Sequence, residues 1–355
     1  MADDGAMSLD FLVGFTIFML ALIMVVSMVP GLLAGLESSG IDYDAVAYRT
    51  GVILVEDPGW PVYPPWEMND EDHKDEIERI GLAVSKDTPN ILLSTKVNVF
   101  FNDSFFDPRD YRSKVIFGDI PYSYNFSFRS EDGTYDKKTG TPLPPGHGYI
   151  RRVVKIKEPG VAVIDDRFRS QYTIPDPLDP RWNSIARNFT VQLNFSQLLN
   201  QSVGPAYRID PRTEPVTVSI NVSQYLNSTC INATLHDVAF WKMDPTRPSP
   251  RFTRIPFSYA EEDPDFYTLH IDGTSNECLY SLEPGARVNE SITLVLKPAA
   301  TSQFTLDQNS ILEIRFNFKD DPPHTNITGI HHYDYNVTNV TLPDLKPGVL
   351  EVTIW

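Results

Sequence analysis

The chain has 355 residues, a formal net charge of −17 at pH 7 and a sequence pI near 4.8. This acidic balance argues against a nucleic-acid partner, because phosphate binding requires a basic surface. The chain also lacks a Gly-rich phosphate loop, a G-x-S-x-G elbow, an H-E-x-x-H helix and a C-x-x-C pair, so neither an enzyme nor a cofactor is expected.

The first predicted element is a long apolar helix. Residues 11–36 are 26 residues without Asp, Glu, Lys, Arg or His, and as a helix they exceed a hydrocarbon core of about 30 Å. The run is too long for a secretory signal, and no small-residue cleavage site follows it. We therefore expect one membrane-spanning helix that stays on the mature chain, with Pro30 kinking or locally unwinding it.

A stem helix is predicted to follow the span and to end at Asp57-Pro58-Gly59. Residues 58–110 are interpreted as a connecting region with a short helix around residues 75–84. The buried side of the stem is predicted from apolar spacings of three and four. Its members are Ile41, Ala45, Tyr48, Val52 and Val55.

From residue 111 onward, apolar and polar residues alternate in runs rich in Val, Ile, Thr and aromatic side chains, as in half-buried strands. Pro, Gly and Asp turns separate the runs, which favours antiparallel β-sandwich architecture and an α+β chain overall. We expect two consecutive β-domains, with one large sandwich as the alternative. The expected division is 1–5 leader, 6–57 membrane-spanning and stem helix, 58–110 connecting region, 111–212 β-rich domain and 213–355 C-terminal β-sandwich.

Asparagines in N-x-S/T sequons indicate the side of the membrane on which this β-rich head lies. Twelve of the 19 asparagines are in sequons, whereas chance would place about three there. We therefore expect an extracellular head that carries N-linked glycans from an oligosaccharyltransferase; the alternative is strand ends and turns rich in Ser, Thr and Asn. The sequons are at Asn102, Asn125, Asn188, Asn194, Asn200, Asn221, Asn227, Asn232, Asn289, Asn326, Asn336 and Asn339.

Two cysteines, Cys230 and Cys278, fit an exported domain, in which a disulfide between them would contribute about 3–4 kcal/mol. Two buried free thiols are the alternative. His331, His332 and Asp334 have the residue types of metal ligands, but only His332 and Asp334 would share a strand face, and zinc needs three or four ligands. No metal site is expected. Large aromatics, including Trp60, Trp66, Trp182 and Trp241, are predicted to lie in the core.

The N-terminus resembles the class III signal of archaeal type IV pilin-like proteins. The resemblance rests on a short hydrophilic leader ending in Gly5, then Ala6-Met7-Ser8-Leu9-Asp10, then the apolar helix that starts at Phe11 and contains Pro30. The stretches AYRTGVILVEDPGWP, RIGLAV and ILLSTKV are similar to the membrane-proximal part of large archaeal pilin-like proteins. No part of the head carries the resemblance.

The resemblance implies that a prepilin peptidase cuts between Gly5 and Ala6 and leaves the apolar helix on the mature chain. It also implies homo-oligomerisation, or co-assembly with other pilin-like subunits, through a core of such helices that lies in the membrane before assembly. There Asp10 would meet the new α-amino group of a neighbouring copy, in a charge-assisted pair that sets the register of the subunits.

Two other functions remain open from the sequence. One is a cell-surface receptor or adhesin held by an uncleaved signal anchor, with Asp10 at the membrane interface, where its cost is small; the Asp3-Asp4 pair in the leader agrees with this alternative. The other is a tethered glycan-active enzyme, which requires two carboxylates about 5–10 Å apart across a cleft.

Overall fold

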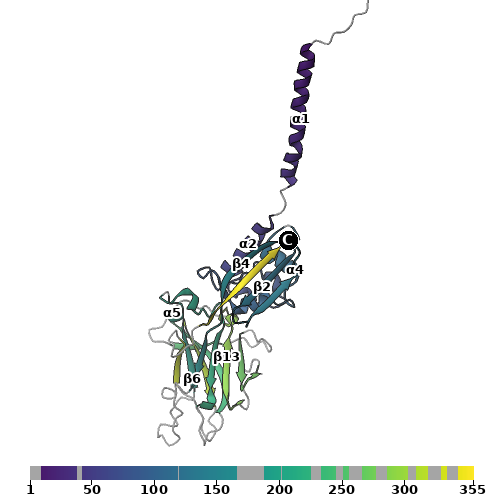
Figure 1. Cartoon of the computed structure of the whole chain (residues 1–355). Coiled ribbons are helices and arrows are strands. Elements are labelled where there is room, and N and C mark those ends of the chain that lie inside the picture. The colour runs from purple at the N-terminus through teal and green to yellow at the C-terminus, as the bar shows by residue number, and fades with distance from the viewer. Residues whose placement is uncertain are drawn as a thin grey trace, which may run out of the picture.

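The computed structural model has an apolar N-terminal helix, α1 (Leu9–Glu37), that extends from a mostly β-stranded head (Figure 1). The expectation of an α+β chain with this order is confirmed. The structure describes residues 9–37, 42–118, 120–165, 188–200, 202–224, 233–244, 251–255, 266–276, 286–302, 309–318, 329–333 and 343–355.

The half of the head nearer to α1 is here called the proximal unit, residues 42–157 and 345–355. Its five-stranded sheet has the order β1-β4-β16-β2-β3, in which only the β1–β4 pair is parallel. The strands are β1 (Ile91–Leu93), β2 (Tyr124–Ser130), β3 (Asp136–Gly140), β4 (Gly148–Lys157) and β16 (Leu345–Ile354). The helices are α2 (Tyr43–Glu56), η1 (Trp66–Met68), η2 (Lys74–Glu76), α3 (Ser94–Phe100), α4 (Pro108–Tyr111) and the π-helical η3 (Arg112–Ile116).

Helix α2 lies directly on this sheet. The Asp42 side chain caps it by accepting from Ala45 N at 3.0 Å. It ends at Glu56 with Asp57 as C-cap, so the predicted stop is confirmed. A Cβ atom on Gly51 would lie 2.9 Å from Ile150 Cγ2, and only a side chain this small allows the close approach.

The predicted buried face of the stem is wrong except at Val55. The buried residues of α2 are Ala47, Thr50, Gly51, Leu54 and Val55, whereas Tyr48 is 55% exposed. The small side chains of Ala47, Thr50 and Gly51 let the helix axis approach the sheet, and Leu54 and Val55 are buried beside them. Hydrophobic spacing alone cannot report this preference.

Residues 58–110 belong to the proximal core rather than connecting two parts. Trp66, Ile80, Leu92 and Phe100 are fully buried in one cluster with residues of β2, β4 and β16. The helix expected around residues 75–84 is not formed. Only η2 is helical there, because Ile80 N and Leu82 N donate to the carbonyls of Lys114 and Leu54 in other elements.

The distal unit, the described residues between 161 and 333, has two sheets. One has the order β11-β10-β13-β7-β5, and the other β12-β8-β14-β6-β15 with β9 paired to β8. The strands are β5 (Val161–Ile164), β6 (Asn188–Asn194), β7 (Val216–Asn221), β8 (Ala233–Asp244), β9 (Arg251–Arg254), β10 (Tyr267–Ile271), β11 (Thr274–Asn276), β12 (Ala286–Val288), β13 (Ser291–Leu296), β14 (Ile311–Phe318) and β15 (Gly329–Tyr333). Short helices are α5 (Phe195–Leu198), η6 (Pro205–Tyr207), η7 (Val222–Gln224) and α6 (Pro298–Ser302).

Alternate residues of both distal sheets contribute to one hydrophobic cluster. Val216, Val218 and Ile220 enter it from β7, and Phe189 and Leu193 from β6. This cluster is separate from that of the proximal unit. The pairs β5–β7 and β6–β15 are parallel, so the sheets are mixed rather than wholly antiparallel.

The chain enters and leaves the distal unit at one point. It crosses at residues 158–160 and returns at residues 343–344, where Glu158 N donates to Asp344 O at 2.9 Å. The returning strand β16, the yellow arrow in Figure 1, then inserts between β4 and β2. Strand pairing therefore does not follow the division expected at residue 212. The distal unit is an insertion within the proximal one.

Candidate membrane and assembly site

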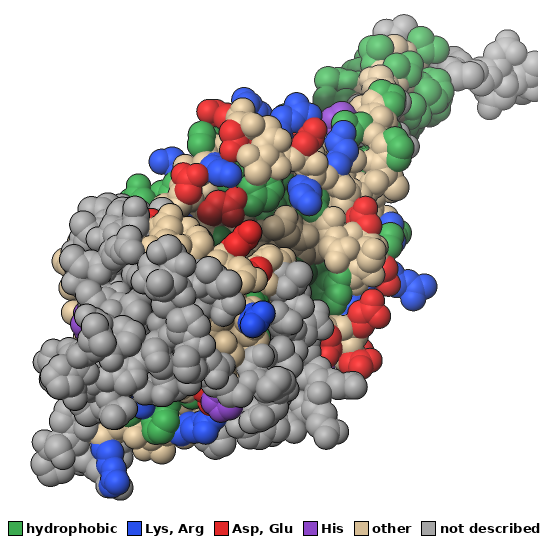
Figure 2. Space-filling view, turned by 90° about the horizontal axis from the view of Figure 1, so that it is seen from below, with side chains coloured by type: hydrophobic (Ala, Val, Ile, Leu, Met, Phe, Trp, Pro, Cys, Tyr) green, Lys and Arg blue, Asp and Glu red, His purple; other side chains and the backbone are tan. Residues whose placement is uncertain are grey.

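Helix α1 presents apolar side chains on every side. The segment Phe11–Met28 has a mean hydropathy of 2.6, and none of it is buried inside the molecule. Figure 2 shows hydrophobic side chains gathered along the part of the chain that extends from the head. A helix of a soluble protein usually has one apolar stripe against a core, whereas a helix that is apolar all round is typical of a lipid or helix-bundle environment.

The two hydroxyl side chains of this segment bond to their own helix. Thr16 Oγ1 donates to Leu12 O, and Ser27 Oγ donates to Met24 O, each at 2.8 Å. Such bonds satisfy hydroxyl donors where water is absent. Within the described residues, Phe11–Met28 is the one helical segment long and apolar enough to cross a membrane.

Some of the residues predicted to act in processing and assembly lie within this helix. Gly5 and Ala6 are outside the described residues. Asp10 and Pro30 are within α1, although their side chains are not described, and the helix continues through Pro30 to Glu37 without unwinding. Phe11 is 62% exposed, and its ring stacks on that of Phe15 at 6.3 Å between centroids.

A cleft of about 430 Å³ lies where the two units meet. Pro58, Tyr63 and Lys86 line it from the proximal unit, and Arg208 and Arg212 from the distal unit. The Arg212 guanidinium carbon lies 5.3 Å from the centroid of the Tyr63 ring, a cation–π contact between the units. Burial is the main cause that raises the pKa of Tyr63, and the nearby Asp210 carboxylate adds to it.

Two carboxylates at this cleft, those of Asp210 and Glu214, form ion pairs. Arg212 donates to both oxygens of Asp210 at 2.8 Å. Lys157, at the end of β4, donates to Glu214 Oε1 at 2.8 Å and lies 2.7 Å from Oε2, with both side chains essentially inaccessible. Lys157 Nζ also donates to Arg208 O at 2.6 Å. Since each charge is paired and hydrogen-bonded, this buried contact ties the units together.

A second buried carboxylate lies in the proximal core. Glu67 is 6% exposed, and neither of its oxygens has a hydrogen-bond partner among the described residues. Burial raises the pKa of Glu67 to about 7, against the opposing charge of Lys96. The Lys96 ammonium donates to Pro58 O at 2.7 Å and Ala83 O at 3.0 Å, and burial lowers its pKa.

Seven of the 12 sequon asparagines are described, and their surroundings differ. Asn102, Asn200 and Asn289 are exposed, whereas Asn188, Asn194 and Asn221 are half-buried. Asn125 is 9% exposed inside β2, and its Nδ2 donates to Thr141 O at 2.9 Å. The remaining five, Asn227, Asn232, Asn326, Asn336 and Asn339, lie outside the described residues.

Four of these asparagines make the same local turn. At Asn102, Asn194, Asn200 and Asn221, the side-chain oxygen accepts from the backbone or hydroxyl of the serine two residues later. This turn uses Oδ1 of the asparagine as the acceptor. It leaves Nδ2, the atom that carries an N-glycan, outside that hydrogen bond.

The other residues singled out in the sequence are placed as follows. Cys230, Cys278, Trp182 and Asp334 lie outside the described residues. His331 is fully buried on β15, and no group of three or more His, Cys, Asp or Glu in the described part of the chain is arranged to hold a metal. Trp66 is fully buried, as expected, but Trp60 is 48% exposed, so that core prediction is wrong.

Comparison with known proteins adds one finding. Residues 2–164 match the model of a family of unknown function, DUF7287. The match covers α1 and most of the proximal unit, ends at β5, and leaves out β16, which is central in the proximal sheet. No curated protein and no solved structure matches the chain.

Sequence reasoning did not find the cleft, because its two sides lie more than 100 residues apart in the chain. The aromatic VYPPW stretch and the charged RIDPRTE stretch supply residues that line the cleft, but no spacing rule predicts that they lie together. Lys157 is at the end of the alternating run YIRRVVKIK, where a lysine is ordinarily exposed. Its burial depends on Glu214, which only the fold brings near.

Proposed function

We propose that this chain is a structural subunit, major or minor, of an extracellular filament of the archaeal type IV pilus kind. The observation that carries the proposal is α1, an all-round apolar helix that is exposed along Phe11–Met28 and joined to a folded head. The resemblance at Gly5, Ala6 and Asp10 supports the same reading.

In this proposal, the helix lies in the membrane before assembly and in the filament core afterwards. A prepilin peptidase removes residues 1–5, and the new amino group at Ala6 pairs with Asp10 of a neighbouring copy. A charge-assisted pair of this kind, in a poorly hydrated core, favours one register of packing over others. The head, two β-rich units of which the distal one is a β-sandwich, forms the glycosylated outer surface.

A second candidate function is a membrane-anchored binding protein that does not polymerise. The cleft of about 430 Å³ between the units favours it, because its volume and its mixture of aromatic and charged groups suit a small ligand. In that case α1 serves only as the anchor, and Asp10 has no partner in another copy.

The substitution Asp10→Ala separates the two functions. A filament subunit loses assembly when the register-setting carboxylate is removed, while its insertion into the membrane persists. The matched control is Ser27→Ala, since the Ser27 hydroxyl bonds only within its own helix among the described residues. Sheared filaments and membranes are quantified separately for the wild type and both variants.

A photo-reactive side chain at Phe18, which is 59% exposed, provides a direct readout of the surroundings of α1. Adducts between two copies of α1 are expected in the sheared fraction. Adducts with lipid alone, together with unchanged extracellular material from Asp10→Ala, would refute the filament proposal and leave the anchored binding protein.

A further inference from the structure

The middle of one face of the proximal sheet is open, whereas Asn125 and Thr353 at one end of that face are buried. Along β4, Tyr149 is 44% exposed and Val153 is 71% exposed, whereas the other face carries α2 and the hydrophobic cluster. Strand register places the exposed residues in rows across the sheet. Val153 is opposite Val349, which is opposite Arg129, and Arg151 is opposite Glu351, which is opposite Ser127.

This open face is basic although the chain is acidic. Its cations are Arg129, Lys138, Arg151 and Lys155, and its anions are Asp136 and Glu351. We call this set of six the basic face. It carries a net charge of +2 (four cations less two anions), or +1 with the exposed Glu131 in the turn after β2, on a chain of −17.

Most of the positive charge on the basic face is unpaired. Arg129 lies 3.6 Å from Asp136, but Lys138, Arg151 and Lys155 make no ion pair with any described residue. Glu351 accepts hydrogen bonds from the Ser127 and Tyr149 hydroxyls at 3.0 and 2.8 Å. A hollow of about 180 Å³ on this face is lined by Arg129 and Arg151 but also by the carboxylates of Glu131, Asp136 and Glu351, so the unpaired positive charge of the face lies mainly with Lys138 and Lys155.

Residues 70–78 form the acidic counterpart, here called the acidic segment. Six of its side chains are exposed carboxylates, and its lysine, Lys74, is already paired with Asp110 at 2.6 Å. The carboxylates are Asp70, Glu71, Asp72, Asp75, Glu76 and Glu78. The net charge of the segment is therefore strongly negative at neutral pH.

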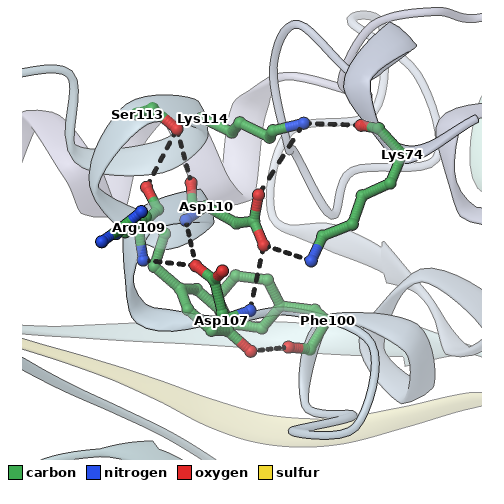
Figure 3. Close-up of polar contacts among 8 residues, drawn as sticks. Lys74, Phe100, Asp107, Arg109, Asp110, Ser113 and Lys114 are labelled. Atoms are coloured by element: carbon green, nitrogen blue, oxygen red, sulfur yellow. Dashed lines mark hydrogen bonds and ion pairs between the residues drawn. The ribbon is translucent and has the colours of Figure 1, made fainter. Parts of the chain in front are cut away.

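The acidic segment is anchored to the proximal unit through Lys74. Figure 3 shows Lys74 and Lys114 converging on Asp110, which lies in α4. Lys114 Nζ also donates to Lys74 O at 2.6 Å, and Asp110 is fixed in turn by a reciprocal capping box with Asp107. A pre-ordered segment loses little conformational entropy when it binds.

The basic face and the acidic segment lie on opposite sides of the proximal unit. The acidic segment rests on α4, where Lys74 Nζ lies 5.8 Å from the Phe106 ring centroid. That ring packs on Tyr111, which contacts Phe126 on the inner face of the sheet. One copy therefore cannot join its own two surfaces, and a contact between them must involve two copies.

We propose that the basic face of one copy binds the acidic segment of a second copy. Such a contact is head-to-tail, because it joins two different surfaces. It therefore repeats from copy to copy, and unless the rotation closes a ring it builds a filament. The inference rests on the proposed function and names the surfaces through which neighbouring heads touch. Val153 and Tyr149 supply exposed apolar area within the interface, and the charges fix its orientation.

The test uses charge-reversed versions of the full chain in native membranes. Variant A carries Arg151→Glu and Lys155→Glu on the basic face. Variant B carries Glu71→Arg, Asp72→Arg, Asp75→Arg and Glu76→Arg, which change the net charge of the acidic segment from −5 (six carboxylates less Lys74) to +3. The matched control for A carries Arg251→Glu and Arg287→Glu, which makes the same charge change at exposed positions of the distal unit. Filament yield and carbodiimide cross-links between isotopically light and heavy copies are measured.

Variants A and B are each expected to lose filaments and intercopy cross-links from Lys138, which neither variant changes, to residues 70–78 by about tenfold or more, because like charges then face each other. A mixture of A and B should regain both, since alternating copies restore opposite charges at every contact. The control should match the wild type.

The outcomes separate the two proposals. If the wild type forms filaments and variants A and B do as well, with no such cross-links, the contact between the basic face and the acidic segment is refuted while the filament function stands. If the wild type forms no filaments and no intercopy cross-links, both proposals fail. Cross-links from the basic face to a different protein would also overturn the inference and identify the occupant of that face.

Discussion

The buried carboxylate of Glu67 makes a sharp prediction about stability and pH. Its pKa is raised from 4.5 to about 7 in the folded chain, chiefly by burial. Between these values the unfolded chain has released the proton while the folded chain keeps it, so the free energy of unfolding falls as the pH rises. The full loss is about 3 kcal/mol, at roughly 1.4 kcal/mol for each pH unit of difference, and it becomes constant above about pH 7.

The substitution Glu67→Gln removes this titration while keeping the size of the side chain. From about pH 4.5 to 8, the free energy of unfolding of the wild type is expected to fall by about 3 kcal/mol relative to that of Glu67→Gln. Urea unfolding of the full chain in detergent, followed by tryptophan fluorescence, measures both, and Trp66 in the same buried cluster is a local probe. The exposed Glu78, changed to Gln, is the matched control and should follow the wild type. Parallel pH profiles for the wild type and Glu67→Gln would refute the assignment.

Three further predictions concern the junction, the stem and the glycans. Lys157→Met leaves Glu214 as an unpaired buried charge and should cost about 3–5 kcal/mol in urea unfolding, while Lys157→Met with Glu214→Met should recover most of the loss; equal losses in both would contradict the pairing. Gly148→Ala would place a Cβ atom 2.2 Å from the Tyr43 backbone and should cost about 1–3 kcal/mol, whereas Gly204→Ala, whose nearest neighbour is a Tyr207 carbon at 3.7 Å, should be nearly neutral by the same assay. Glycopeptide mass spectrometry should find glycans at the exposed Asn102 and Asn200 but none at the buried Asn125; an occupied Asn125 would contradict its placement inside β2.

The apolar helix is predictable because its signal is local. Length and lack of charge over residues 11–36 are enough, and no knowledge of partners is needed. The strands are also visible as alternation, for example in VTVSIN, where Val216, Val218 and Ile220 are buried and the residues between them are half-buried.

Strand pairing and the burial of individual residues depend on parts of the chain that are distant in sequence. β16 follows β15 in the chain but pairs with β4 and β2, and nothing in GVLEVTIW identifies those partners. The buried face predicted for the stem is wrong except at Val55, because Gly51 and Thr50 do not count as apolar in a hydrophobic pattern, although their small size lets α2 approach the sheet. The buried charges Glu67 and Lys157 appear in the sequence as ordinary surface residues, and only the fold shows them to be enclosed.

Recognising the basic face requires both the local sequence and the strand pairing. Its four cations can be identified in the sequence, but their union on one side of a sheet needs the register of β2, β3, β4 and β16. The acidic segment is visible in the sequence as DEDHKDEIE. Its contact with α4, however, depends on Asp110 and Lys114, more than 30 residues away.

The central claim, that α1 is a processed filament helix, is tested most directly at the N-terminus of the mature protein. The measurement is the mass of the N-terminal peptide of the protein purified from its native cells. A peptide that begins at Ala6 is the expected result, with Asp10 five residues into the mature chain. A peptide that begins at Met1 or Ala2 would contradict the claim and make α1 an ordinary membrane anchor.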